Sequence, residues 1–232
     1  MSKMLAAENL TQAALAAMID HTLIDATVTQ RQMMRHCREA LEHGFATVAV
    51  SPASVARCVA ELAGSPVGVC AAVAFPLGQA TTAAKVFEAS EALEQGASEI
   101  DVVVNIGAVK DGNMCYVASE VGEVVRACAG HVVKIILETC YLTDLEKKAL
   151  LEISIEAGAA FVKTSTGRGP RGATMPDVLL LRSLAQERIK IKAAGGIQTL
   201  DQALGYIDAG CERIGTSRAV AIMDEAAEVL SA

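Results

Sequence analysis

Three charged residues stand inside short apolar runs of this 232-residue chain. Asp101 lies in EIDVVVNIG, Lys163 in AAFVKTSTG and Lys192 in IKIKAAGGI. A charged side chain in such a run is costly unless it is paired or functional. Together these residue types allow Schiff-base chemistry. A deprotonated lysine amine can attack a carbonyl carbon, and a carboxylate can move a proton.

We expect the two lysines on adjacent strands, where two ammonium groups disfavour each other's charged form. A cationic neighbour and partial burial both lower the pKa of a lysine from its ordinary value of about 10.4. Lys192 would act in this way on Lys163, and Asp101 would hold the pair or move a proton. A buried ion network without catalytic use explains the spacing equally well. For Lys134, in VVKIILET, we expect a solvated position or a structural salt bridge.

The segments after these runs are rich in glycine, hydroxyl and arginine side chains. TSTGRGPRGAT follows Lys163, AAGGI follows Lys192, and RIGTSR lies near the end of the chain. Backbone N–H groups of glycine-containing loops cradle phosphate in many barrel proteins. The sequence predicts such a cradle from these residues: Gly195, Gly196, Gly215, Thr216 and Ser217, with Arg168, Arg171 and Arg218 for charge.

Short β-branched runs alternate with longer segments of helical period. Nearly continuous apolar runs indicate parallel strands that are covered on both faces. The predicted strands are Met18–Leu23, Thr47–Val50, Val67–Phe75, Glu99–Val104, Val132–Leu137, Ala160–Thr164, Ile189–Ala193 and Arg213–Gly215. The predicted helices are Gln30–His43, Ser54–Ala63, Thr81–Gln95, Met114–Ala129, Asp144–Ala157, Pro176–Gln186, Leu200–Ala209 and Ala219–Leu230.

Eight strand-then-helix units predict a (β/α)8 TIM barrel, a single domain over residues 1–232 with a short extra helix before the first strand. A doubly wound open sheet is the alternative, but HTLIDATVTQ after the first strand lacks its G-x-G-x-x-G loop. Helix-end residues support the count. The expected N-caps are Thr29, Ser54, Thr143 and Thr199, and the expected C-terminal glycines are Gly44, Gly96, Gly158 and Gly210.

The composition excludes several classes of protein. An apolar content of 52% with 20% charged residues excludes a disordered chain. A net charge of −7 with 3% aromatic residues argues against nucleic acid as a partner, although a local cationic pocket can still bind a small anion. Seven scattered cysteines without a C-x-x-C pair predict reduced core thiols in a cytoplasmic protein.

Targeting, membrane and metal signals are absent from the pattern. The first twenty residues do not read as a signal peptide. The charge-free stretch Leu62–Ala84 is broken by prolines and glycines, so we expect a buried strand, a loop and a helix start rather than a membrane span. The four histidines lack metal-ligand spacing, and we expect no metal or cofactor. For His21 we expect a packed structural role.

The segments HTLID, EIDVVVNIG, FVKTSTG, KAAGGI and RIGTS, in this order, resemble those of the deoxyribose-phosphate aldolases. The resemblance covers nearly the whole chain. It implies a (β/α)8 barrel and a metal-independent class I aldolase. Such an enzyme cleaves 2-deoxy-D-ribose 5-phosphate to D-glyceraldehyde 3-phosphate and acetaldehyde through a lysine Schiff base and an enamine, and it runs the reverse condensation.

The resemblance also implies roles for single residues. Lys163 would form the Schiff base, Lys192 would lower its pKa, and Asp101 would take part in the proton relay. The implied partners are a small sugar phosphate and acetaldehyde, with no nucleic acid and no membrane, and a homo-oligomer, a dimer above all. The implied substrate-binding residues are Asp20, Thr22, Thr166, Gly167, Arg168, Gly195, Gly196, Gly215, Ser217 and Arg218.

Several features depart from the family pattern, among them Arg168, which stands where lysine or an aromatic residue is common, and Ala49, which stands where cysteine is common. Gln198 stands where arginine is common, and Arg218 stands where a small residue is common. The chain ends in LSA, without the tyrosine-bearing tail of some relatives. The exchange of arginines either conserves charge at the phosphate or signals another substrate. One alternative is therefore a related class I aldolase with a different phosphorylated or unphosphorylated aldehyde acceptor. A non-catalytic barrel that binds a sugar phosphate is another.

Overall fold

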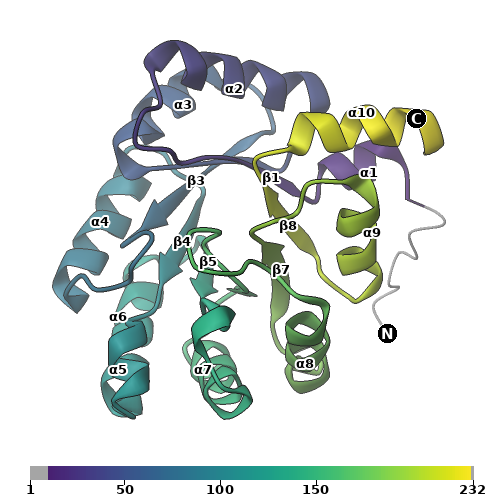
Figure 1. The fold of residues 1–232 in the computed structure, drawn as a ribbon. Helices are drawn as coiled ribbons and strands as arrows, with labels where there is room; N and C mark the ends of the chain where they lie inside the picture. Colours follow the sequence, from purple (N-terminus) through teal and green to yellow (C-terminus); the bar gives the residue numbers. More distant parts are fainter. Residues whose placement is uncertain (1–9, 231–232) are drawn as a thin grey trace.

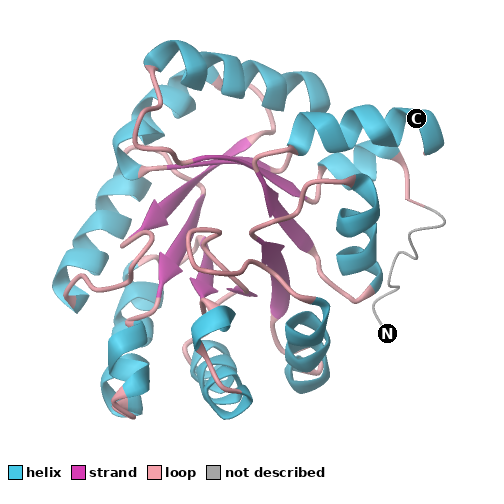
Figure 2. Ribbon diagram, in the orientation of Figure 1, coloured by secondary structure: helices cyan, strands magenta, loops and turns pink. Residues whose placement is uncertain are grey.

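Eight parallel strands form a closed barrel in the computed structural model, which describes residues 10–230. Figure 1 shows the helices around the strands, and Figure 2 shows the strands enclosed by this helical layer. The strands are β1 (Ile19–Leu23), β2 (Thr47–Val50), β3 (Gly68–Val73), β4 (Glu99–Val103), β5 (Val132–Ile136), β6 (Phe161–Lys163), β7 (Lys190–Ala194) and β8 (Arg213–Thr216).

The helices that cover the barrel begin and end close to the predicted residues. Their bounds are α1 (Gln12–Ala16), α2 (Gln30–His43), α3 (Val55–Glu61), α4 (Thr82–Glu94), α5 (Ile106–Lys110), α6 (Met114–Ala127), α7 (Asp144–Glu156), α8 (Met175–Ala185), α9 (Leu200–Asp208) and α10 (Ala219–Val229). Helix α1 is the expected extra helix before β1. The short α5 and the 3₁₀ turns Pro52–Ser54 and Thr139–Tyr141 were not predicted, because segments this short carry no periodic signal.

The (β/α)8 barrel is confirmed, and the open-sheet alternative is wrong. Strand β1 pairs with β2 on one side and with β8 on the other, so the sheet has no free edge. The charge-free stretch forms β3, a loop and the start of α4, as expected. In the described part of the chain, no helix is long and apolar enough to cross a membrane. The expectations for the first nine residues and the last two lie outside the described residues.

The helix ends show which predicted caps form. Thr29 and Thr143 each make a capping box, and Thr199 accepts a hydrogen bond from the backbone of Gln202. The cap predicted at Ser54 is wrong, because the preceding 3₁₀ turn leaves this residue helical (φ −102°, ψ −9°) rather than extended. The four predicted C-terminal glycines all have positive φ.

The apolar core lies between the strands and the helices rather than inside the barrel. Along each strand the side chains alternate between the two faces, so Ile100 and Val102 join this core while Asp101 between them does not. Charged side chains, among them Asp101, Lys134 and Lys192, occupy much of the barrel interior.

Two stacked histidines join β1 to α2. The rings of His21 and His36 lie 3.7 Å apart between centroids, His36 Nε2 is 3.1 Å from the backbone oxygen of His21, and His21 Nε2 is 3.1 Å from Glu39. Burial lowers the pKa of His21 to about 4 and that of His36 to about 3, because it disfavours the charged ring. His21 therefore has the packed, structural position that the sequence led us to expect.

The unfolding free energy should decrease as the pH falls from about 6.5 to 4, because the unfolded chain then binds more protons at His21 and His36 than the folded chain does. Each histidine would remove up to about 1.4 kcal/mol per pH unit. Urea unfolding at pH 7 and pH 5 measures the loss. The variant His36→Phe keeps a stacked ring and should show about half of it. An equal loss in both proteins would contradict this account.

Candidate active site

Charged side chains from β4, β5, β6 and β7 meet inside the barrel around one carboxylate. Asp101 Oδ2 lies 2.8 Å from Lys163 Nζ and 2.7 Å from Lys192 Nζ. Asp101 Oδ1 lies 2.8 Å from Lys134 Nζ. Lys163 and Lys192 are register partners on adjacent strands, so both side chains reach the same interior layer. The structure thus brings the three predicted catalytic residues together.

The lower part of this network supplies further carboxylates. Lys192 Nζ lies 2.5 Å from Asp20, and Lys134 Nζ lies 2.5 Å from Glu99. Arg213 joins the two acids, at 2.5 Å from Asp20 and 3.0 Å from Glu99. Lys134 is 0% exposed, so the expected solvated position is wrong and the salt-bridge alternative holds. It faces inward because it is the register partner of Asp101 on the neighbouring strand.

The charges of this network balance only when one lysine is neutral. Asp20, Glu99 and Asp101 are the carboxylates, and they face Lys134, Lys192, Arg213 and Lys163. Lys134, Lys192 and Arg213 each contact two or more of these acids, whereas Lys163 Nζ is paired with Asp101 alone among the described residues. Lys163 is therefore the amine that loses its proton most readily.

The pKa shifts follow from these contacts. Burial lowers the pKa of Lys163, Asp101 partly opposes this, and Lys192 lowers it further. The pKa of Lys192 is raised, because Asp101 and Asp20 outweigh the opposing effect of burial. Burial works to raise the pKa of Asp101, but three lysines hold it well below its ordinary value. The Lys163 amine, whose pKa is lowered, thus sits beside Lys192, whose pKa is raised, and this arrangement suits attack on a carbonyl.

A cavity of about 280 Å³ opens above this network at the carboxyl ends of the strands. Thr22, Lys163, Thr166, Gly167, Arg168, Gly195, Gly196, Gly215, Thr216, Ser217 and Arg218 line it as predicted. Asp20 and Arg171 are not among the lining residues. Asp20 lies two residues before Thr22 on β1, one layer deeper in the barrel, where Lys192, Arg213 and Thr47 bind its carboxylate. The expectation that Asp20 lines the pocket is therefore wrong.

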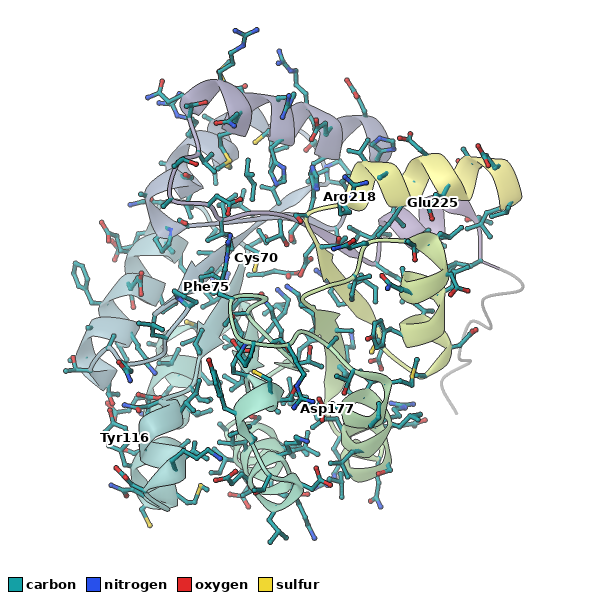
Figure 3. The ribbon with its side chains drawn as sticks, in the orientation of Figure 1. Cys70, Phe75, Tyr116, Asp177, Arg218 and Glu225 are labelled. Carbon is teal, nitrogen blue, oxygen red and sulfur yellow. The ribbon has the colours of Figure 1, made fainter. Side chains whose placement is uncertain are left out.

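Other residues that line the cavity were not predicted from the sequence. Figure 3 shows Phe75 just after β3 and Arg218 beside the start of α10. The Phe75 ring centroid lies 5.9 Å from Lys163 Nζ. Its position directly after a barrel strand was a usable signal, because functional groups follow such strands. The other unpredicted lining residues are Ile24, Asp25, Ala194 and Ile197. Gln198, which stands where arginine is common, also lines the cavity.

One predicted phosphate ligand is already engaged. The guanidinium of Arg168 lies 2.5 Å from Asp25 and donates to the backbone oxygen of Ile24 at 2.9 Å. This pair connects the loop after β6 with the loop after β1. Arg218 has no such ion pair among the described residues, and its backbone N–H donates to Thr216. Arg218 is therefore the freer cation at this cavity.

The loops after β6 and β7 touch through glycine backbones. A Cβ atom on Gly172 would lie 2.0 Å from the carbonyl oxygen of Gly195, and one on Gly195 would lie 3.0 Å from the Cα atoms of Gly167 and Gly172. Figure 1 shows both loops crossing in front of the strands. Only glycine permits this close approach, which sets the shape of the predicted cradle.

Two groups of side chains lie close enough to ligate a metal. The first, Asp20, Cys70 and Asp101, is surrounded by the lysine ammonium groups, which would repel a cation. The second, His21, His36 and Glu39, lies outside the barrel interior between β1 and α2. Neither group contributes to the lining of the cavity above Lys163.

The fold and the site define a class: a (β/α)8 barrel protein whose mouth holds an amine suited to carbonyl chemistry. The model of the DeoC/LacD family aldolases matches residues 14–217. The chain belongs to this family.

Relatives support the assignment over most of the chain. It is 50% identical over 210 residues to the deoxyribose-phosphate aldolase of Dictyoglomus turgidum, covering 90% of this chain and 96% of that protein. It is 50% identical over 214 residues to that of Caldanaerobacter subterraneus, with 91% and 93% covered. The structure of the deoxyribose phosphate aldolase from Aeropyrum pernix superposes with a TM-score of 0.88 at 35% identity, over 94% of this chain and 93% of that one.

Removal of the Lys192 charge should raise the pKa of Lys163, since an ammonium neighbour is lost while Asp20 and Asp101 remain. Trapping of acetaldehyde on Lys163 with borohydride should then need a pH about one unit higher in Lys192→Met. Peptide mass mapping across a pH series gives the midpoint. Lys190→Met, on the exposed start of the same strand, is the control and should leave it unchanged. An unchanged midpoint in folded Lys192→Met would remove this role.

Proposed function

We propose that this chain is a class I aldolase that reversibly cleaves 2-deoxy-D-ribose 5-phosphate into D-glyceraldehyde 3-phosphate and acetaldehyde. The single observation that carries the proposal is the Lys163 amine, which reaches the cavity and is held beside Lys192 by one oxygen of Asp101. Family membership and relatives named deoxyribose-phosphate aldolase at about half sequence identity support the substrate.

Lys163 carries the covalent chemistry. Its neutral amine attacks the aldehyde carbon of the open-chain sugar, and loss of water gives a protonated imine on Nζ. The imine accepts the electron pair of the C2–C3 bond as that bond breaks, while the C3 hydroxyl loses its proton and becomes the aldehyde of glyceraldehyde 3-phosphate. The remaining enamine takes a proton on its α-carbon, and water releases acetaldehyde and restores the amine.

Lys192 and Asp101 serve the proton transfers. Asp101 Oδ2 binds the nitrogen atoms of both Lys163 and Lys192, so a proton on Lys192 lies one carboxylate oxygen away from the reacting nitrogen. We assign the relay to these two residues with a water molecule. Asp20 holds Lys192 in place and keeps it charged, a positioning role rather than contact with substrate.

The glycine loops and one helix start would hold the phosphate. Gly195, Gly196, Gly215 and Ser217 line one side of the cavity. Helix α10 begins next to it at Ala219, where unpaired backbone N–H groups favour an anion. Arg218 adds a cationic side chain, and the Thr22 hydroxyl suits the sugar.

A second candidate is a related class I aldolase with a different aldehyde acceptor. The specific observation in its favour is that Gln198 lines the cavity while the Arg168 guanidinium is paired with Asp25, which leaves Arg218 as the main free cation there. Such an enzyme would use the same Schiff base on Lys163. It would differ in its preference for a phosphate group.

We further propose a homo-oligomer, a dimer above all, that works in the cytoplasm. The relative from Aeropyrum pernix is described as tetrameric, which supports assembly of some kind. The seven cysteines are all free thiols in the structure, and five of them are buried, which suits a reducing compartment.

Borohydride treatment in the presence of acetaldehyde or the sugar phosphate should attach the two-carbon or five-carbon unit to Lys163. Lys163→Met should lose the adduct and at least about 10³-fold in kcat, because no other amine lines the cavity in the described structure. Peptide mass mapping locates the adduct. Lys148→Met, an exposed lysine on α7, is the control and should behave as wild type. A folded wild-type chain without an adduct on Lys163 would refute the proposal.

The value of kcat/KM for deoxyribose 5-phosphate should exceed that for unphosphorylated deoxyribose by about 10²-fold or more, because charge-assisted hydrogen bonds to the phosphate would be lost. Arg218→Gln should lower only the value for the phosphorylated sugar. Steady-state kinetics with both substrates decides the matter. A ratio near one would argue against a working phosphate site and favour the second candidate.

A further inference from the structure

Glu138 is a buried carboxylate that none of the roles above uses. It follows β5 closely, is 2% exposed, and forms no ion pair in the described part of the chain. Its backbone is left-handed (φ 55°, ψ 61°), a conformation that normally favours glycine. A glutamate at this left-handed position, buried without an ion pair in the described part of the chain, indicates that its side chain has a use.

The short hydrogen bonds of the Glu138 carboxylate all lead to the segment after Lys163. Its two oxygens accept the backbone N–H of Thr166 at 3.2 and 3.3 Å, and one of them also accepts the Thr166 hydroxyl. The Thr166 oxygen in turn accepts the backbone N–H of Arg168 at 3.0 Å. One carboxylate therefore holds Thr166 directly and Arg168 through the Thr166 hydroxyl, and both residues line the cavity.

The hydrogen bonds between Glu138 and Thr166 also restrain the glycine loops of the predicted phosphate cradle. Gly167 lies between the two held residues, and its backbone packs against that of Gly195 on the next loop. On its far side the loop is anchored by Ala173, whose N–H donates to the backbone oxygens of Ala194 and Gly195 and whose carbonyl oxygen accepts the Tyr206 hydroxyl. A shift of Thr166 would therefore displace Gly167 against Gly195.

Lys163 itself does not depend on this side chain. Its backbone oxygen accepts the N–H of Leu137, and the next oxygen, of Thr164, accepts the N–H of Thr139. Its amine is held by Asp101. Loss of the Glu138 carboxylate should therefore disturb the loop without disturbing the reactive amine.

We propose that Glu138 is a positioning residue for substrate binding: it sets the loop Thr166–Arg168 against the Gly195 loop, so that the phosphate-bearing end of the substrate is held. The proposal rests on the proposed aldolase function and deepens it. Glu138 acts through Thr166 and does not touch the reacting atoms. It is thus expected to govern KM for the phosphorylated sugar rather than the imine step.

The test compares Glu138→Gly with Glu138→Gln. Glycine fits the left-handed backbone and removes only the side chain, whereas glutamine keeps an oxygen acceptor for Thr166. In Glu138→Gly, KM for deoxyribose 5-phosphate should rise about tenfold or more, while kcat and the rate of acetaldehyde trapping on Lys163 stay within about threefold. Glu138→Gln should return KM to within about threefold of wild type.

The chain offers a matched control in Glu187→Gly. Glu187 is also left-handed (φ 66°), but it is exposed and lies between α8 and β7, at the end of the barrel away from the cavity. This variant should leave KM, kcat and trapping unchanged. Thr166→Val removes the hydroxyl contact but keeps the backbone N–H contact with Glu138, so it should give part of the same rise in KM. KM of the double variant should be no higher than that of Glu138→Gly.

An unchanged KM in Glu138→Gly or in Thr166→Val would overturn the proposal. Equal losses in KM, kcat and trapping would also overturn it, because they would show a general structural role. A misfolded Glu138→Gly would leave Thr166→Val to decide in the same way. If the wild-type protein forms no Lys163 adduct, the proposed function fails. If the wild type is active and the Glu138 and Thr166 variants have a normal KM, only the role of Glu138 is refuted.

Discussion

Charge balance around Asp101 is the constraint on which the site depends. Three carboxylates and four cationic side chains share the buried interior of the barrel, and the charges balance when one cation is neutral. The peripheral member of the network, Lys163, is the one with the fewest carboxylate partners. Burial lowers the pKa of Lys163 and Lys192 lowers it further, while Lys134 and Arg213 pair with the acids deeper in the barrel and do not line the cavity.

This constraint explains why the barrel interior departs from the usual filling of branched apolar side chains. The strands keep their apolar face toward the helices, where Ile100, Ile135 and Ile191 pack, and turn charged residues inward. A buried ion cluster of this kind stabilises a fold poorly compared with apolar packing. Its presence below the mouth of the barrel fits the chemistry of an aldolase, because the pKa of the Lys163 amine is lowered there.

Lys163 and the loops around the cavity are held in place by different contacts. The strand ladder fixes Lys163, while close glycine packing between the loops after β6 and β7 shapes the cavity rim. Glu138 and the Arg168–Asp25 pair restrain the same loop from two sides. The Lys163 nitrogen and the backbone that lines the cavity thus have separate supports.

The amino-acid pattern alone determined the barrel, its strand and helix positions, and the proximity of Lys163, Lys192 and Asp101, because period and parallel register place strand ends together. Only the tertiary structure decided which charges pair. Lys134 is buried and Asp20 lies below the cavity because facing strands supply partners that no local pattern reveals. Glu138 and Asp25 were missed for the same reason: their partners are 28 and 143 residues away along the chain.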